Sequence, residues 1–286
     1  MKFGVTFARL RPALWAETAE LCDELGYESV WLPEHLVLPV QQSGSPYSGS
    51  DHPPVRADAP VFDVFTMLAF FAGRTERIRL GTNVYNIGLR HPFVTARAVA
   101  TLDIVSGGRV ELGIGASWLA EEWDATGLDF ATRGSRVDEA LTVCKRLWTE
   151  PEIEHKGEHF QFAPVAFEPK PVQSGGPPIS VGGDSKLALR RAAVHGDGWI
   201  PMNTPIGGLA AARAEIAALR HEAGRDGQFT VTVMGAPSSQ EDIAAYVRAG
   251  VDRLVVFPWH RSAEAADGLR SFAQTYLSGT GNEDVR

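Results

Sequence analysis

The chain has 286 residues, 44% of them hydrophobic, which is enough to fill the core of one large domain. Its net charge of -8 lacks the basic surplus that general binding to nucleic acid or to an anionic membrane requires, so we expect neither partner. The apolar run at 1–7 is too short for a signal peptide or a membrane span, which predicts a cytoplasmic protein.

Short apolar strands alternate with helical patterns along the whole chain. Strands are predicted at 3–7, 28–32, 78–84, 109–114, 179–181, 197–201, 229–234 and 252–257. Helices are predicted at 12–25, 61–73, 92–106, 133–148, 186–193, 209–222, 238–250 and 263–277. Eight such units favour a (β/α)₈ TIM barrel over the alternative, a doubly wound open sheet. We therefore expect a single α/β barrel domain over 1–286.

Three local features interrupt or punctuate this alternation. A hairpin around Lys156-Gly157 is predicted as an insertion at about 152–168. Ser238 and Glu241 form a possible capping box for the seventh helix. The stretches at 33–60 and 116–132 are predicted as long loops, and loops of this length inside a compact domain are usually functional.

A glycine pair, Gly182-Gly183, stands between the fifth strand and its helix, with Asp184 or Ser185 as the predicted N-cap. Free N–H groups at such a helix start bind anions, so a phosphate of a cofactor or substrate is one interpretation. The other is a tight strand-to-helix turn without a ligand. The stretch by itself does not decide between them.

Polar, aromatic and small residues follow most of the strands, at the end where a barrel carries its active site. They are Glu34-His35, Thr82-Asn83 with Tyr85, Gly115 to Trp118, Gly182-Gly183, Met202-Asn203 and Trp259-His260. His35 is the main candidate for proton transfer or for a hydrogen bond to a ring system. The alternative is a histidine that bonds only a backbone carbonyl.

The residues at these strand ends do not match the motifs of metal-dependent or hydrolytic active sites. The sequence has no His-x-His pair after the first strand, no lysine at a strand end and no Gly-x-Ser-x-Gly elbow, so neither a metal site nor a hydrolytic centre is expected. Gly113-Ile114-Gly115 is a weak dinucleotide signal, because no third glycine follows. Arg90-His91 could contact an acidic group or be solvated. Cys22 and Cys144 fall in helical patterns and are predicted to be core side chains.

Several motifs, in the same order over nearly the whole chain, resemble the luciferase-like monooxygenase superfamily, and within it the branch of deazaflavin (coenzyme F-420) dependent oxidoreductases. The motifs are Ser29-Val30-Trp31-Leu32-Pro33-Glu34-His35, Arg77-Ile78-Arg79-Leu80-Gly81-Thr82-Asn83-Val84, Thr101-Leu102-Asp103-Ile104-Val105-Ser106-Gly107-Gly108-Arg109, Leu112-Gly113-Ile114-Gly115, Lys156-Gly157, Pro178-Ile179-Ser180-Val181-Gly182-Gly183 and Gly196-Asp197-Gly198-Trp199.

The resemblance implies a bacterial luciferase-like (β/α)₈ barrel with a flavin-type ring over its mouth, His35 and Glu34 as catalytic residues, and a non-prolyl cis peptide at Asn83-Val84. The cofactor contacts it implies are Phe7, His35, Thr82, Asn83, Val84, Gly115, Ala116, Ser117, Gly182, Gly183 and Asp184. Glu34 stands where many relatives have Asp. Trp118 stands where the sugar-phosphate dehydrogenases of this branch carry a catalytic Glu, so that acid and that substrate are not carried over.

The expected function is hydride transfer between reduced coenzyme F-420 and a small organic substrate. The alternatives are a flavin mononucleotide (FMN) monooxygenase that uses reduced flavin and oxygen, and a barrel that binds flavin without turnover. The resemblance also implies a homodimer formed through the helices at 61–73 and 92–106.

Overall fold

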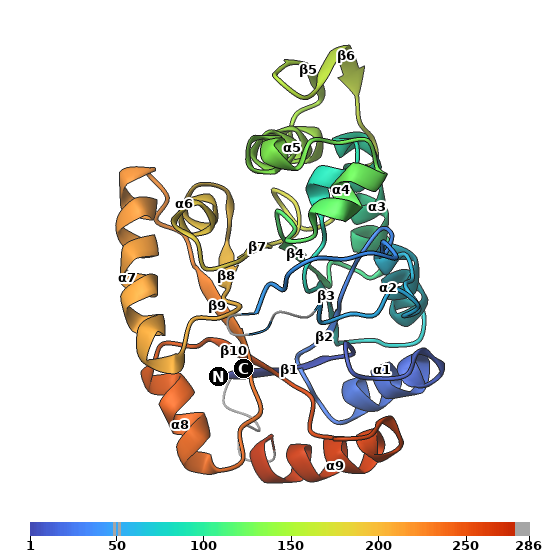
Figure 1. Cartoon of the computed structure of the whole chain (residues 1–286), viewed down its shortest axis with the longest axis vertical. Helices are drawn as coiled ribbons and strands as arrows, with labels where there is room; N and C mark the ends of the chain where they lie inside the picture. The colour runs from blue at the N-terminus through green and yellow to red at the C-terminus, as the bar shows by residue number, and fades with distance from the viewer. Residues whose placement is uncertain (48–49, 51–52, 278–286) are drawn as a thin grey trace.

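Eight parallel strands close into a barrel in the computed structural model, which describes residues 1–47, 50 and 53–277 (Figure 1). Around the barrel the strands follow the order β1-β10-β9-β8-β7-β4-β3-β2. Their bounds are β1 (Lys2–Thr6), β2 (Ser29–Leu32), β3 (Arg79–Thr82), β4 (Val110–Ile114), β7 (Ile179–Gly182), β8 (Gly198–Ile200), β9 (Thr230–Met234) and β10 (Arg253–Val256). The predicted (β/α)₈ barrel is thus confirmed, and the open-sheet alternative is excluded by the closure.

The predicted helices surround the barrel (Figure 1). They are α1 (Trp15–Glu24), α2 (Val64–Ala72), α3 (Pro92–Val105), α5 (Arg133–Thr149), α6 (Lys186–His195), α7 (Ile206–Glu222), α8 (Gln240–Arg248) and α9 (Ala265–Tyr276). The capping box of α8 is made by Ser239 and Asp242, so the predicted pair Ser238 and Glu241 was wrong. The N-cap lies one residue later than expected, at Ser239, which places Asp242 at the third helical position.

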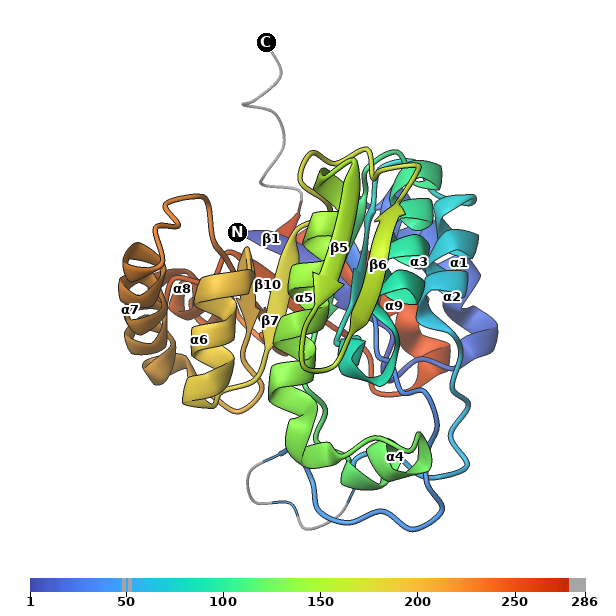
Figure 2. The ribbon, with the colours of Figure 1, turned by 90° about the horizontal axis from the view of Figure 1, so that it is seen from above.

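Two further elements lie outside the regular alternation. The hairpin of β5 (Glu152–Lys156) and β6 (Gln161–Ala166) is confirmed, and it packs on α5 outside the barrel (Figure 2). The short helix α4 (Ala120–Ala125) was not predicted and lies within the loop expected at 116–132. Figure 2 shows α4 beside the loop that follows β2, beyond the end of the barrel opposite the N-terminus. These two segments cover the carboxyl ends of the strands.

The barrel interior is filled around Trp31. A Cβ on Gly81 would lie 2.4 Å from the Trp31 ring, so the glycine makes room for the indole. Ile200, Val255 and the side chain of Val84 pack against Trp31. Val84 is the second residue after β3, and it therefore forms part of the layer between the barrel interior and the mouth.

The amino end of the barrel is closed by a buried ion network. Arg253 is only 2% exposed and donates to both oxygens of Glu28, with an Nη2–Oε1 distance of 2.6 Å, and its Nη2 lies 3.2 Å from Oε1 of Glu111. Arg79 also donates to Glu111, at 2.6 Å. These charges join β10, β3 and β4 at the end away from the loops, a position that serves stability in such barrels.

Both cysteines are fully buried, as predicted. Burial raises the pKa of each thiol well above its ordinary value, which makes them unreactive core side chains. Within the described part of the chain, no helix is both long and apolar enough to cross a membrane. The same residues contain no cluster of His, Cys, Asp and Glu suited to a metal ion.

Candidate active site

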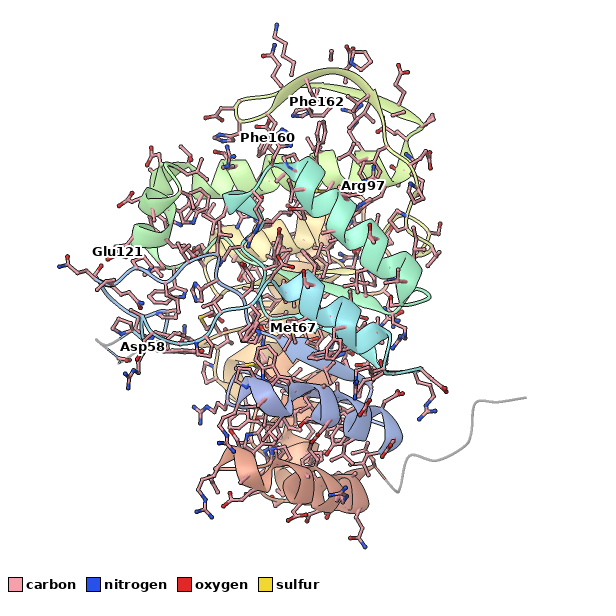
Figure 3. All side chains as sticks on the ribbon, turned by 90° about the vertical axis from the view of Figure 1, so that its right-hand side faces the viewer. Asp58, Met67, Arg97, Glu121, Phe160 and Phe162 are labelled. Atoms are coloured by element: carbon pink, nitrogen blue, oxygen red, sulfur yellow. The ribbon has the colours of Figure 1, made fainter. Side chains whose placement is uncertain are left out.

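The carboxyl ends of the strands lie under the loop that follows β2 and under α4. In Figure 3 the labelled Asp58 of that loop and Glu121 of α4 lie at the same end of the molecule, away from the labelled hairpin residues Phe160 and Phe162. Residues that follow β2, β3, β4 and β7 gather beneath these segments. This is the region in which a barrel of this architecture places its chemistry.

Glu34, the first polar residue after β2, is buried in a polar cage. Its Oε1 accepts a hydrogen bond from Nη2 of Arg90 at 2.6 Å, and its Oε2 accepts one from the backbone N–H of Asn86 at 2.9 Å. Burial raises the pKa of the Glu34 carboxyl, although the Arg90 charge and the Asn86 N–H oppose that rise. Because both oxygens are engaged inside the protein, this carboxylate is placed to fix the segment after β3 rather than to exchange a proton with a ligand.

His35 contacts a carboxylate. The alternative interpretation, a histidine that bonds only a backbone carbonyl, is therefore wrong. Nδ1 of His35 lies 3.0 Å from Oε2 of Glu122, a fully buried residue of α4. The ring of Trp118 meets the imidazole edge-on, with the centroids 6.0 Å apart. Nε2 of His35 has no hydrogen-bond partner among the described residues. That nitrogen is therefore free to interact with a molecule bound at the mouth.

The peptide bond between Asn83 and Val84 is cis, as predicted. The Val84 side chain lies between the ends of β4 and β7, where a Cβ on Gly115 would come within 2.7 Å of it and a Cβ on Gly182 within 3.1 Å. Asn83 reaches the other side of the mouth and donates to the sulfur of Met234 at 2.8 Å. The Asn83-Val84 pair at the end of β3 thus contacts the ends of β4, β7 and β9. Ala116 and Ser117 are half-buried beside them, Ser117 with a φ of 65°.

The glycine pair after β7 is arranged differently from the prediction. Gly183 has a φ of 113°, which only glycine adopts readily, but its N–H is not free because it donates to the carbonyl of Ile200 at 3.0 Å. The N-cap of α6 is Ser185, whereas the Asp184 carboxylate accepts hydrogen bonds from the backbone of the loop after β8. No acceptor among the described residues engages the N–H groups of Asp184, Ser185, Lys186 and Leu187. The donors available to an anion are therefore these four.

Two of the implied cofactor contacts have side chains that do not reach the mouth. Phe7 is fully buried against Trp15 and Phe71, in the layer between barrel and helices. The hydroxyl of Thr82 is buried and donates to the carbonyl of Gly113 at 2.7 Å. Neither side chain has surface available to a ligand, and both are left out of the proposal below.

Sequence reasoning missed Glu122 and left the role of Arg90 open. Arg90 does contact an acidic group, Glu34, and the hint lay in its position between β3 and α3, directly above a strand end. Nothing in the sequence distinguishes Glu122 from its neighbour Glu121, because only the fold turns one of them inward. His91 caps α3 through its Nδ1, which accepts from the N–H of Phe93 at 3.2 Å.

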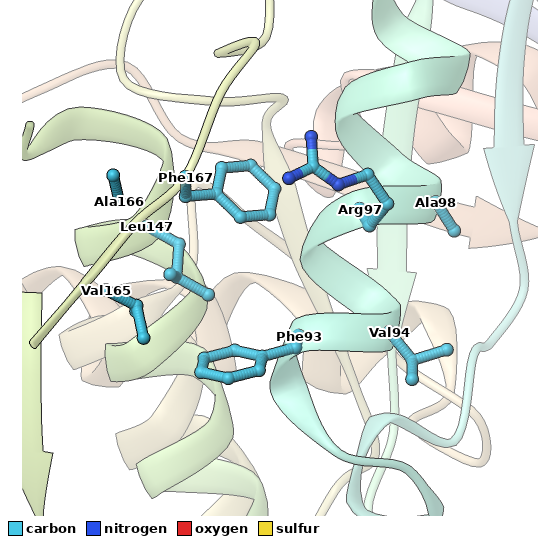
Figure 4. A pocket seen from close by; sticks show the side chains of 8 residues that line it. All are labelled: Phe93, Val94, Arg97, Ala98, Leu147, Val165, Ala166 and Phe167. Carbon is cyan, nitrogen blue, oxygen red and sulfur yellow. The ribbon is translucent and has the colours of Figure 1, made fainter. Parts of the chain in front are cut away.

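A separate apolar groove of about 640 Å³ lies on the outer face, away from these residues (Figure 4). Phe93, Val94, Arg97 and Ala98 of α3, Leu147 of α5, and Val165, Ala166 and Phe167 at the end of the hairpin form its walls. It shares no residue with the mouth of the barrel. Its size therefore gives no reason to move the candidate site from the strand ends.

The closed parallel barrel, with polar and small residues gathered at the carboxyl ends of its strands, defines the class as a (β/α)₈ barrel of enzyme type. Residues 8–283 match the model of the luciferase-like monooxygenase family, and the chain belongs to that family. The superfamily resemblance of the sequence motifs is thereby confirmed.

Three relatives illustrate what this chain is similar to. An uncharacterized protein of Mycobacterium tuberculosis is 30% identical over 270 residues, which are 93% of this chain and 95% of that protein. An F420-dependent secondary alcohol dehydrogenase, solved with an F420-acetone adduct, has a TM-score of 0.79 at 16% identity and covers 97% of this chain and 98% of its own. The oxygenating constituent of 3,6-diketocamphane monooxygenase from Pseudomonas putida, solved with FMN, has a TM-score of 0.65 at 18% identity, over 85% of this chain and 69% of its own. At these identities the two structures share the fold with this chain.

Proposed function

We propose that this protein is an oxidoreductase that transfers a hydride between reduced coenzyme F-420 and a small organic substrate. The observation that carries the proposal is the carboxyl end of the barrel, where Val84 packs between Gly115 and the half-buried Gly182 and where Nε2 of His35 has no partner among the described residues. Small residues let a flat ring approach the backbone closely. Membership of the luciferase-like monooxygenase family supports an oxidoreductase. The choice of deazaflavin over flavin rests on the resemblance of the sequence motifs.

The residues present fit such a cofactor. When bound, the deazaflavin supplies the hydride chemistry, and the protein supplies binding and orientation. The N–H groups of Asp184, Ser185, Lys186 and Leu187 at the start of α6, which have no acceptor among the described residues, suit its phosphate. Lys186 and Arg190, exposed on the same helix, form no ion pair within the described part of the chain and would offset the charge of its glutamate tail. His35 would donate to, or accept from, the ring or the substrate through Nε2.

The rival cofactor is FMN, which is bound by a structure of the same fold. Both cofactors carry a tricyclic ring and a phosphate, so the start of α6 suits either. A third alternative is a barrel that binds the ring without turnover. Trp118, whose ring contacts His35 edge-on, stands where the sugar-phosphate dehydrogenases of this branch carry a catalytic Glu. We therefore do not extend the substrate class to sugar phosphates.

The test is turnover of reduced F-420 with a panel of ketones, aldehydes, imines and activated alkenes, followed by the absorbance of the oxidised coenzyme. We expect at least one class to be reduced by the wild-type protein. Oxygen-dependent turnover of reduced FMN in place of this activity would favour the monooxygenase. Binding of either cofactor without turnover of any panel member would favour the non-catalytic barrel.

We also propose that the protein is a cytoplasmic homodimer that associates through α2 and α3. Phe70 of α2 and Val94 and Val105 of α3 are exposed apolar residues on these helices. Light scattering at micromolar concentration should give a dimer for the wild type and a monomer for Val94→Glu. The matched control is Leu187→Glu on α6, an equally apolar exposed position, which should remain dimeric. A monomeric wild-type protein would contradict the proposal.

A further inference from the structure

Glu122 is the only carboxylate of α4 that is completely buried, and it lies directly against His35. Among the described residues it forms no ion pair with lysine or arginine. Its hydrogen-bond donors are the imidazole and two backbone N–H groups, those of Leu36 and Val37. A buried carboxylate is stable only when its oxygens are well supplied with donors, so each of these three contacts matters.

The two carboxylate oxygens of Glu122 have different hydrogen-bond partners. Oε1 accepts from the N–H of Leu36 at 2.6 Å and from that of Val37 at 3.3 Å. A backbone N–H can only donate, so Oε1 is held as an acceptor and the carboxylate cannot rotate. Oε2 is then the only oxygen that faces Nδ1 of His35, at 3.0 Å. An ionised carboxylate accepts hydrogen bonds only, so its Oε2 can bond to Nδ1 only when Nδ1 carries the proton.

The imidazole is confined on a second side as well. Trp118 meets it at 90° with the ring centroids 6.0 Å apart. The other buried carboxylate nearby, Glu34, is occupied by Arg90 at 2.6 Å and does not compete for His35. The ring plane and the identity of the nitrogen that faces the protein are therefore both determined by the surroundings.

We propose that Glu122 is a positioning residue for His35. It keeps the proton of the neutral ring on Nδ1, so that Nε2, which has no partner among the described residues, is the nitrogen that accepts or returns a proton at the mouth. The contact itself does not depend on the cofactor, but its use in catalysis rests on the proposed function. In its absence the neutral ring would be free to place its proton on Nε2, where it could donate but not accept.

Nitrogen-15 NMR of the ligand-free protein with labelled histidines tests the proposal, with the His35 signals assigned by their loss in His35→Gln. At a pH where the ring is neutral, we expect the wild type to show a protonated Nδ1 and a bare Nε2. The opposite tautomer in the wild type would overturn the proposal without any variant. This readout requires neither cofactor nor turnover.

Glu122→Gln should reverse the tautomer. The two backbone N–H groups hold the amide oxygen at the Oε1 position, which turns the amide NH₂ towards Nδ1 and makes Nδ1 an acceptor. The matched control is Glu121→Gln, the same change on the neighbouring residue of α4, which contacts Ser43 and should leave the tautomer unchanged. A protonated Nδ1 that persists in a folded Glu122→Gln protein would also overturn the proposal.

Kinetics then separate this inference from the proposed function. With reduced F-420 and an active substrate, Glu122→Gln should lower kcat by about tenfold or more, in the range typical of general acid–base catalysis, and change KM much less. Glu121→Gln should match the wild type. A folded Glu122→Gln variant with the wild-type kcat would refute the catalytic use of the contact. Failure of the wild type to bind F-420, with the expected tautomer in place, would reject the cofactor and support the Glu122 contact.

Discussion

Gly183 offers the most direct test of the proposed phosphate site at the start of α6. Its φ of 113° is closed to β-branched residues, and a Cβ at this position would lie 3.3 Å from the Cβ of Ala188 on α6. Holding a residue in such a region costs on the order of 1–3 kcal/mol. Gly183→Val would relieve this strain by moving the first turn of α6, which carries the free N–H groups. Since about 1.4 kcal/mol corresponds to a tenfold change in affinity, we expect binding of F-420 to weaken at least about tenfold.

The assay is quenching of the coenzyme's fluorescence, accompanied by circular dichroism to establish that the variant is folded. Gly224→Val is the matched control, because Gly224 also has a positive φ of 67°, follows α7, and would place its Cβ in open space. It should lose stability through the same backbone strain and bind F-420 normally. A folded Gly183→Val protein with unchanged affinity would refute the reasoning and leave the glycine pair as a tight turn only.

Three further changes address the proposed catalytic histidine, the ion network at the amino end of the barrel and the stability at low pH. His35→Ala should remain folded and lower turnover with F-420 by about 100-fold or more, as removal of a proton-transfer group does; a full-rate variant would make His35 a bystander. Arg253→Ala should lower the free energy of unfolding by about 3–5 kcal/mol in urea titrations, because it removes the buried cation that Glu28 and Glu111 share and leaves them only Lys2 and Arg79; a loss below about 1 kcal/mol would contradict this. Although burial favours protonation of Asp23, N–H donors from the segment 76–78 lower its pKa below the ordinary value. The stability that the Asp23 carboxylate contributes is therefore complete above its unfolded pKa of about 3.9 and is lost as the pH falls through the lower folded pKa. In Asp23→Asn the free energy of unfolding should therefore fall less steeply with decreasing pH below about pH 4. An unchanged slope would contradict this role of Asp23.

The sequence was informative where structure depends on local pattern. Apolar runs predicted all eight barrel strands, and the resemblance to the luciferase-like family implied the cis peptide at Asn83-Val84. The same alternation could have excluded Phe7, because it shares the parity of Phe3 and Val5, which pack outward with the helices. Strand periodicity is a strong signal because successive side chains point to opposite faces of the sheet.

The parts that sequence reasoning missed depend on contacts between distant segments. The burial of Glu122 follows from its contact with the backbone at Leu36 and Val37, more than eighty positions earlier in the chain. With six residues, α4 is too short to show helical periodicity. Likewise the N–H of Gly183 is taken by Ile200 of the neighbouring strand, a partner that only the barrel register provides.

The relative affinity for the two cofactors is the sharpest test of the proposed F-420 dependence. Fluorescence quenching at about 0.1 M salt compares F-420 with FMN on the same wild-type protein, under conditions in which distant charges are screened. We expect a micromolar or lower Kd for F-420 and an at least about tenfold higher Kd for FMN, which is a difference of roughly 1.4 kcal/mol in binding free energy. The opposite preference would contradict it and place the protein with the flavin monooxygenases of the same fold.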